Sequence, residues 1–95
     1  MRIDVSKFGT TLLTHPSGHE AFLTARAYSI PKEGNESIEL DFSAVKVLTP
    51  SWADEFVRGL EEEFGAERIK IIAGENLSVK MTFETLDASM KKVAT

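Results

Sequence analysis

The chain has 95 residues, 42% hydrophobic and 27% charged, with a net charge of −4, and we expect one cytoplasmic globular domain over residues 1–95. The acidic balance and the absence of a basic stripe argue against nucleic-acid and anionic-membrane partners. The absence of cysteine excludes disulfides and thiol catalysis, and no apolar stretch approaches the length of a membrane span.

The first 30 residues contain two candidate strands and a candidate helix. Residues 2–5, "RIDV", alternate apolar and charged side chains, which is typical of a strand with one buried face. Residues 10–14, "TTLLT", predict a weaker strand that could pair with the first as a hairpin. Ser17 with Glu20 forms a capping box, so we expect a helix over 17–28. Its buried stripe would comprise Ala21, Phe22, Ala25 and Tyr28.

Further strands are predicted on either side of a second helix. Pro31 ends the first helix and opens a polar turn. Residues 37–42, "SIELDF", alternate strictly and predict the clearest strand. "VKVL" at 45–48 follows along the sheet edge or leads into a loop. The β-branched run "RIKIIA" at 68–73 predicts a buried strand.

Two more helices are predicted in the second half of the chain. The one before Gly65 has two possible starts. Thr49 could cap it with Pro50 in the first turn, or Ser51 could cap it with Asp54 completing a capping box. The tail at 77–92 fits strand or helical spacing, and we choose a helix because the helical series is longer and Asn76 can cap it.

This order of elements predicts an α/β fold with a mixed, mainly parallel four-stranded sheet and about three helices packed on it. In such sheets functional groups gather beyond the carboxyl ends of strands and at helix N-termini. The junction between residues 41 and 55 has this location. Its polar candidates are Asp41, Thr49, Ser51, Asp54 and Glu55.

Each candidate also has a purely structural interpretation. Asp41 could join a docking face, or it could accept N–H bonds from the turn that follows. Asp54 and Glu55 could form a docking surface, or they could simply complement the helix dipole. Ser51 and Thr49 could be phosphoacceptors, or helix caps that stabilise by about 1 kcal/mol.

The segment "IELDFSAVKVLTPSWADEF" at 38–56 resembles the core of STAS domains, the fold of bacterial anti-sigma-factor antagonists. It is most similar to a STAS-like family of unknown function with a "DFSxV…SxADE"-type signature. Aligned from Asp41, Ser51 takes the place of the antagonists' phosphorylated serine, and Thr49 that of an aspartate. The chain departs from that pattern at Pro50 and Trp52.

The resemblance implies a non-catalytic regulatory protein-interaction module with no cofactor or metal. Its partner would be an ATPase-fold serine kinase or a sensor protein, and Ser51 would be the phosphoacceptor. Phosphate there would add about −1.5 to −2 charge near Asp54 and Glu55 and repel a docked partner. We expect Trp52 to be partly exposed as part of this docking surface. The alternative is a domain that binds a small molecule, nucleotide or other anion at the same helix N-terminus.

An enzyme or a metal site has less support. His15 and His19 lie four residues apart, but "HPSGH" crosses a proline and a helix start, so the two rings need not share a face. Asp41 with Asp54 could hold a cation, although nothing in their spacing demands it. A convergent cluster of Asp41, His15 and Glu55 would instead indicate an enzyme.

Overall fold

The structure, a computed structural model, describes residues 1–30, 34 and 36–94 and contains two parallel sheets. The larger has the order β1-β3-β5, with β1 at Arg2–Asp4, β3 at Ile38–Asp41 and β5 at Ile69–Ile72. The smaller pairs β2 (Thr11–Leu12) with β4 (Val47–Leu48). The predicted α/β class is therefore confirmed, but the predicted single four-stranded sheet is wrong.

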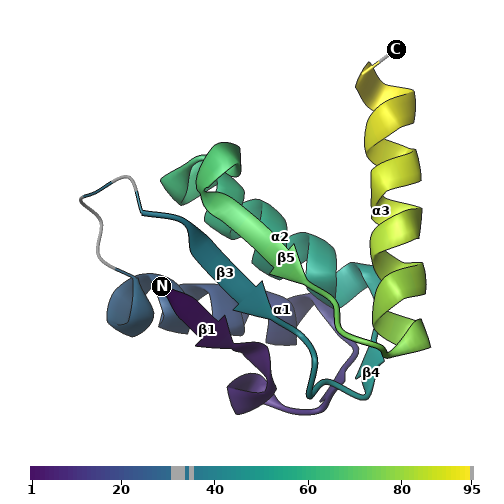
Figure 1. Cartoon of the computed structure of the whole chain (residues 1–95), viewed down its shortest axis with the longest axis horizontal. Helices are drawn as coiled ribbons and strands as arrows, with labels where there is room; N and C mark the ends of the chain where they lie inside the picture. Colours follow the sequence, from purple (N-terminus) through teal and green to yellow (C-terminus); the bar gives the residue numbers. More distant parts are fainter. Residues whose placement is uncertain (31–33, 35, 95) are drawn as a thin grey trace.

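Three helices accompany the larger sheet. They are α1 (His15–Thr24), α2 (Pro50–Phe64) and α3 (Leu77–Ala94). Figure 1 shows α1 and α2 side by side over one face of the sheet, while α3 stands near the carboxyl ends of the strands and projects from the body. The first helix continues as one π-helical turn, η2 (Ala25–Ser29), and no described helix has the length and apolar composition of a membrane span.

The helix starts follow the caps available in the sequence. Thr49 begins α2, since its hydroxyl accepts the N–H of Trp52 at 3.4 Å, which confirms the first of the two predicted starts. Asn76 caps α3 by accepting the N–H of Val79 at 3.2 Å, and the predicted helical tail is confirmed.

The predicted start of α1 at Ser17 is wrong. Helix α1 begins at His15, because the hydroxyl of Thr14 accepts the N–H of Ser17 at 3.2 Å. Pro16 is tolerated in the first turn, where its missing N–H has no intrahelical partner to lose. Residues 31–33, which include the predicted stop at Pro31, lie outside the described residues.

The predicted hairpin between the first two strands is also wrong. After β1 the chain turns away through a short 3₁₀ helix, η1 (Val5–Phe8), and through Gly9 at φ 129°. Strand β2 then pairs in parallel with β4, aligning Leu12 with Leu48. Both leucines are buried, so this register serves the core. The segment predicted as a sheet edge or loop thus supplies one strand of the second sheet.

Strand β5 was predicted to be buried, but it is an edge strand of the larger sheet. It pairs with β3 alone, and Ile71 remains 37% exposed while Ile69 is buried. A short β-branched run has the same sequence pattern at the centre of a sheet as at its edge, so the pattern could not distinguish the two. A 3₁₀ turn, η3 (Ala66–Arg68), precedes β5 and connects it to α2.

The core lies between the larger sheet and helices α1 and α2. The indole of Trp52 is fully buried at its centre and stacks on Phe56 with ring centroids 4.9 Å apart. Its Nε1 donates to Ser17 Oγ at 3.2 Å, so the polar end of the indole is satisfied. Further fully buried side chains come from η1, from β3 and the residue after it, and from α2 and α3: Val5, Ile38, Leu40, Phe42, Leu60 and Val79.

Two glycines allow α1 and α2 to lie unusually close. A Cβ on Gly18 would stand 2.6 Å from the carbonyl oxygen of Trp52, and a Cβ on Gly59 would stand 2.8 Å from the ring of Phe22. Gly18 meets Trp52 and the later residue Phe22 meets the later residue Gly59, so the two helices run in the same direction. Their N-terminal turns therefore meet at one end of the pair.

Replacing Gly18 with alanine tests this close approach. The higher helix propensity of alanine favours folding by about 1 kcal/mol. A methyl group against the Trp52 backbone must push the helices apart, and overpacking of this kind costs roughly 1–3 kcal/mol or more. We expect Gly18→Ala to lower the free energy of unfolding in urea, with Thr24→Ala on the exposed side of α1 near neutral. A more stable Gly18→Ala protein would contradict the packing.

Candidate functional site

Thr49 is fully engaged as a structural residue at the start of α2. Its hydroxyl accepts the Trp52 N–H and donates to the carbonyl of Leu13 at 2.7 Å. One side chain thus caps α2 and ties it to the segment that follows β2. The interpretation of Thr49 as a helix cap is confirmed.

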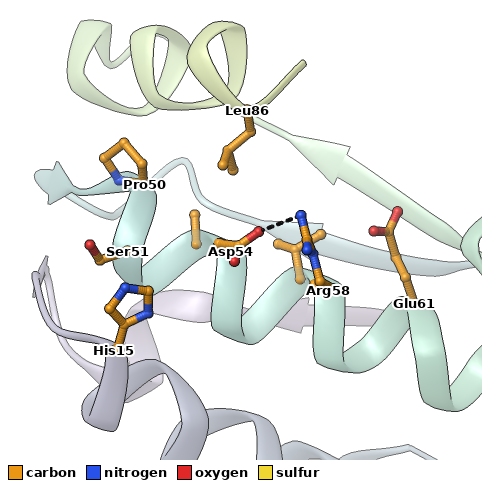
Figure 2. Close-up of a pocket in the computed structure, with 9 residues that line it drawn as sticks. His15, Pro50, Ser51, Asp54, Arg58, Glu61 and Leu86 are labelled. Carbon is orange, nitrogen blue, oxygen red and sulfur yellow. Dashed lines mark ion pairs between the residues drawn. The ribbon is translucent and has the colours of Figure 1, made fainter. Parts of the chain in front are cut away.

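Ser51 is not the cap and lies at the end of a groove. It is half-buried in the first turn of α2 and lines a hollow of about 330 Å³ between α2 and α3, here called the α2–α3 groove. Figure 2 shows the imidazole of His15, from α1, beside the Ser51 hydroxyl at that end. The groove is lined by His15, Pro50, Ser51, Ala53, Asp54, Val57, Arg58, Glu61 and Leu86.

The α2–α3 groove has an apolar floor and a charged rim. Val57 and Leu86 supply apolar surface. On the rim, Arg58 Nη2 lies 3.0 Å from Asp54 Oδ1, an ion pair between residues four apart on α2 (Figure 2). Partial burial raises the pKa of Glu61 above its usual range, and the nearby Arg58 opposes that rise.

Glu55 brings the two histidines of the chain to one place. Its Oε1 lies 3.4 Å from His15 Nδ1, and its Oε2 lies 3.8 Å from His19 Nδ1. The rings share a face of α1 because the helix starts at His15, before the proline, and not at Ser17. The spacing of four residues signals the histidine pair in the sequence, but the meeting of both rings with Glu55, without Asp41, follows only from the fold.

The two histidines nevertheless border different grooves. His19 lines a second hollow, of about 450 Å³, between α1 and α2, together with Phe22, Arg26 and Glu62. His15 lines the α2–α3 groove instead. Among the described side chains, no three His, Asp or Glu residues form a group that could hold a metal ion.

Asp41 lies apart from this cluster. Its Oδ1 accepts the N–H of Ser43 at 2.9 Å, so the turn-forming interpretation is confirmed. The hydrogen bonds from Ser43 hold the pKa of Asp41 below its usual range, and Arg2 on the neighbouring strand adds to the effect. Asp41 alternates with the buried Leu40 and so points away from α1 and α2. Asp41 is not among the residues that line the α2–α3 groove with Ser51.

The prediction that Trp52 is partly exposed is wrong. Its side chain has 0% exposure, because position 52 shares a helical face with Phe56 and that face packs on the core. The indole cannot contribute to a docking surface. Asp54 and Glu55, by contrast, remain half-buried at the surface of α2.

Alanine substitutions at Thr49 and Ser51 test which of the two side chains caps α2. We expect Thr49→Ala to lower the free energy of unfolding by about 1–2 kcal/mol, since it removes the cap and the bond to Leu13. Ser51→Ala should change it by less than about 0.5 kcal/mol. Urea denaturation measures both, with Thr49→Ser as the variant that keeps the hydroxyl. The reverse ranking would mean that Ser51 is the cap.

Asp41 should also make the free energy of unfolding depend on pH. Because its pKa is lower in the folded chain, its ionised form contributes stability above the unfolded pKa of about 3.9. That contribution is lost as pH falls through the folded pKa. The difference in unfolding free energy between wild type and Asp41→Asn should therefore be constant from pH 7 to 6 and shrink below about pH 4. A pH-independent difference would contradict this assignment.

Comparison with known proteins agrees with the fold and with the signature at the start of α2. The family described as "STAS-like domain of unknown function (DUF4325)" matches residues 25–87, which include β3, α2 and β5. No curated protein and no solved structure matches the chain. The matched region covers well over half of the chain and contains both the strand-to-helix junction and the α2 side of the groove. The chain belongs to this STAS-like family.

Proposed function

We propose that the chain is a non-catalytic regulatory module that docks a protein partner on the α2–α3 groove. Phosphorylation of Ser51 would switch this docking. An ATPase-fold serine kinase or a sensor protein, the partner classes implied by the STAS resemblance, would present an apolar side chain to the groove. Membership of the STAS-like family supports the regulatory role.

The position of the Ser51 hydroxyl is the observation that carries the proposal. Thr49 provides the cap, so the Ser51 hydroxyl is not needed for that role. Ser51 instead lines one end of the groove whose apolar surface includes Val57 and Leu86. Trp52, which follows it, turns its indole into the core and leaves the hydroxyl uncovered by that ring.

Phosphorylation would oppose docking by filling the groove with a hydrated charge. A phosphoryl group adds about −1.5 to −2 charge at neutral pH. Placing that charge against the apolar side chain of a partner carries a desolvation penalty. The neighbouring carboxylates of Asp54 and Glu55 increase the local negative charge further.

Anion binding at the start of α2 is less favoured by the same geometry. Pro50 has no N–H to offer, and the N–H of Trp52 is bound to Thr49 Oγ1. The N–H of Ala53 is bound to the Thr49 carbonyl at 3.1 Å. The first turn therefore keeps few donors for an anion, and two carboxylates stand close by.

Binding measurements with a phosphomimic test the proposal. Partners are first captured on the wild-type chain and identified by mass spectrometry, and one purified partner is then titrated against variants. We expect Ser51→Asp to weaken its affinity by about tenfold or more, which corresponds to about 1.4 kcal/mol. Ser37→Asp makes the same change at an exposed position at the start of β3 and should stay within about twofold. Unchanged binding by Ser51→Asp would overturn the switch.

A further inference from the structure

His15 is the ionisable side chain that faces Ser51 across the junction of α1 and α2. Both residues line the same end of the α2–α3 groove, one from each helix (Figure 2). His19, one turn further along α1, lines the other groove. The two histidines therefore differ in their relation to Ser51 although they share Glu55 as a neighbour.

Glu55 leaves one nitrogen of His15 available to the groove. The Glu55 carboxylate lies 3.4 Å from Nδ1. The protonated imidazolium donates from both nitrogens. Nδ1 can then face Glu55 while Nε2 faces a group held in the groove.

The surrounding charges leave His15 as a suitable partner for an added anion. Arg58, the nearby guanidinium, is already paired with Asp54 at 3.0 Å. The titratable or charged groups that α1 and α2 place around His15 and the groove are His19, Asp54, Glu55, Arg58 and Glu61. From α3 the described lining residue is the apolar Leu86.

We infer that His15 is the phosphate receptor of Ser51: its imidazole binds the phosphoryl group and bridges it to Glu55. This inference rests on the proposed phosphorylation of Ser51 and adds the residue that binds the phosphoryl group. The bridge would connect α1 to the first turn of α2. The phosphoryl group would thereby be held across the end of the groove.

Histidine titration by NMR tests the contact on the full chain with phosphoserine incorporated at position 51. An opposite charge within about 4–6 Å favours the charged imidazole, so the pKa of His15 should rise by about one unit, a tenfold change in proton affinity. His19 is the internal control and should shift by clearly less. An unchanged His15, or equal shifts of both rings, would overturn the inference.

The reciprocal measurement follows the phosphate itself. The second pKa of phosphoserine, ordinarily about 6, should be lower in the phosphorylated wild type than in phosphorylated His15→Gln when followed by ³¹P NMR. His19→Gln should match the wild type. Equal effects of the two substitutions on the phosphoserine pKa would mean that His15 acts only through its charge, as His19 does, and would contradict the inference.

These readouts are independent of partner binding. If phosphorylation abolishes partner binding while His15 does not respond, this inference fails and the proposed function stands. If His15 responds while partner affinity is unchanged, the phosphate receptor stands and the proposed switch fails.

Discussion

The close approach of α1 and α2 is the constraint on which both the core and the candidate site depend. Gly18 lies against the backbone of Trp52, and Gly59 lies against the ring of Phe22, so side chains larger than hydrogen are excluded at both points. Because the helices run in the same direction, this contact aligns their first turns. The alignment brings His15 to Glu55 and to the groove that Ser51 lines.

A single residue step separates the surface from the core at the start of α2, between Ser51 and Trp52. Successive residues on an α-helix point about 100° apart, so the inward direction of Trp52 turns Ser51 outward. The indole of Trp52 stacks on Phe56, and its ring N–H donates to the hydroxyl of Ser17. Both the apolar and the polar part of this side chain thus have partners in the core. With the indole turned into the core, Ser51 lies half-buried at the end of the groove.

The end of strand β4 connects the starts of α2 and α3 through hydrogen bonds. The hydroxyl of Thr82, a buried residue of α3, donates to the Leu48 carbonyl at 2.6 Å, and the N–H of Leu48 donates to Ser78 Oγ at 3.2 Å. Thr49, the next residue, caps α2 and binds Leu13. Leu48, the last residue of β4, and Thr49, which follows it, thus fix the starts of α2 and α3 relative to each other. The α2–α3 groove is a consequence of that arrangement.

Local sequence patterns specify the individual elements: the alternation of β3, the apolar stripe of α2 with its end at Gly65, and the cap of α3 at Asn76. The sequence also determined the family, because the signature between Asp41 and Glu55 is contiguous. Tertiary structure decided which strands pair, since Leu12 could meet Leu48 only after the chain turned at Gly9. It decided that Trp52 is buried and that His15 meets Glu55. These features depend on contacts between residues distant in sequence, which local periodicity and capping signals do not encode.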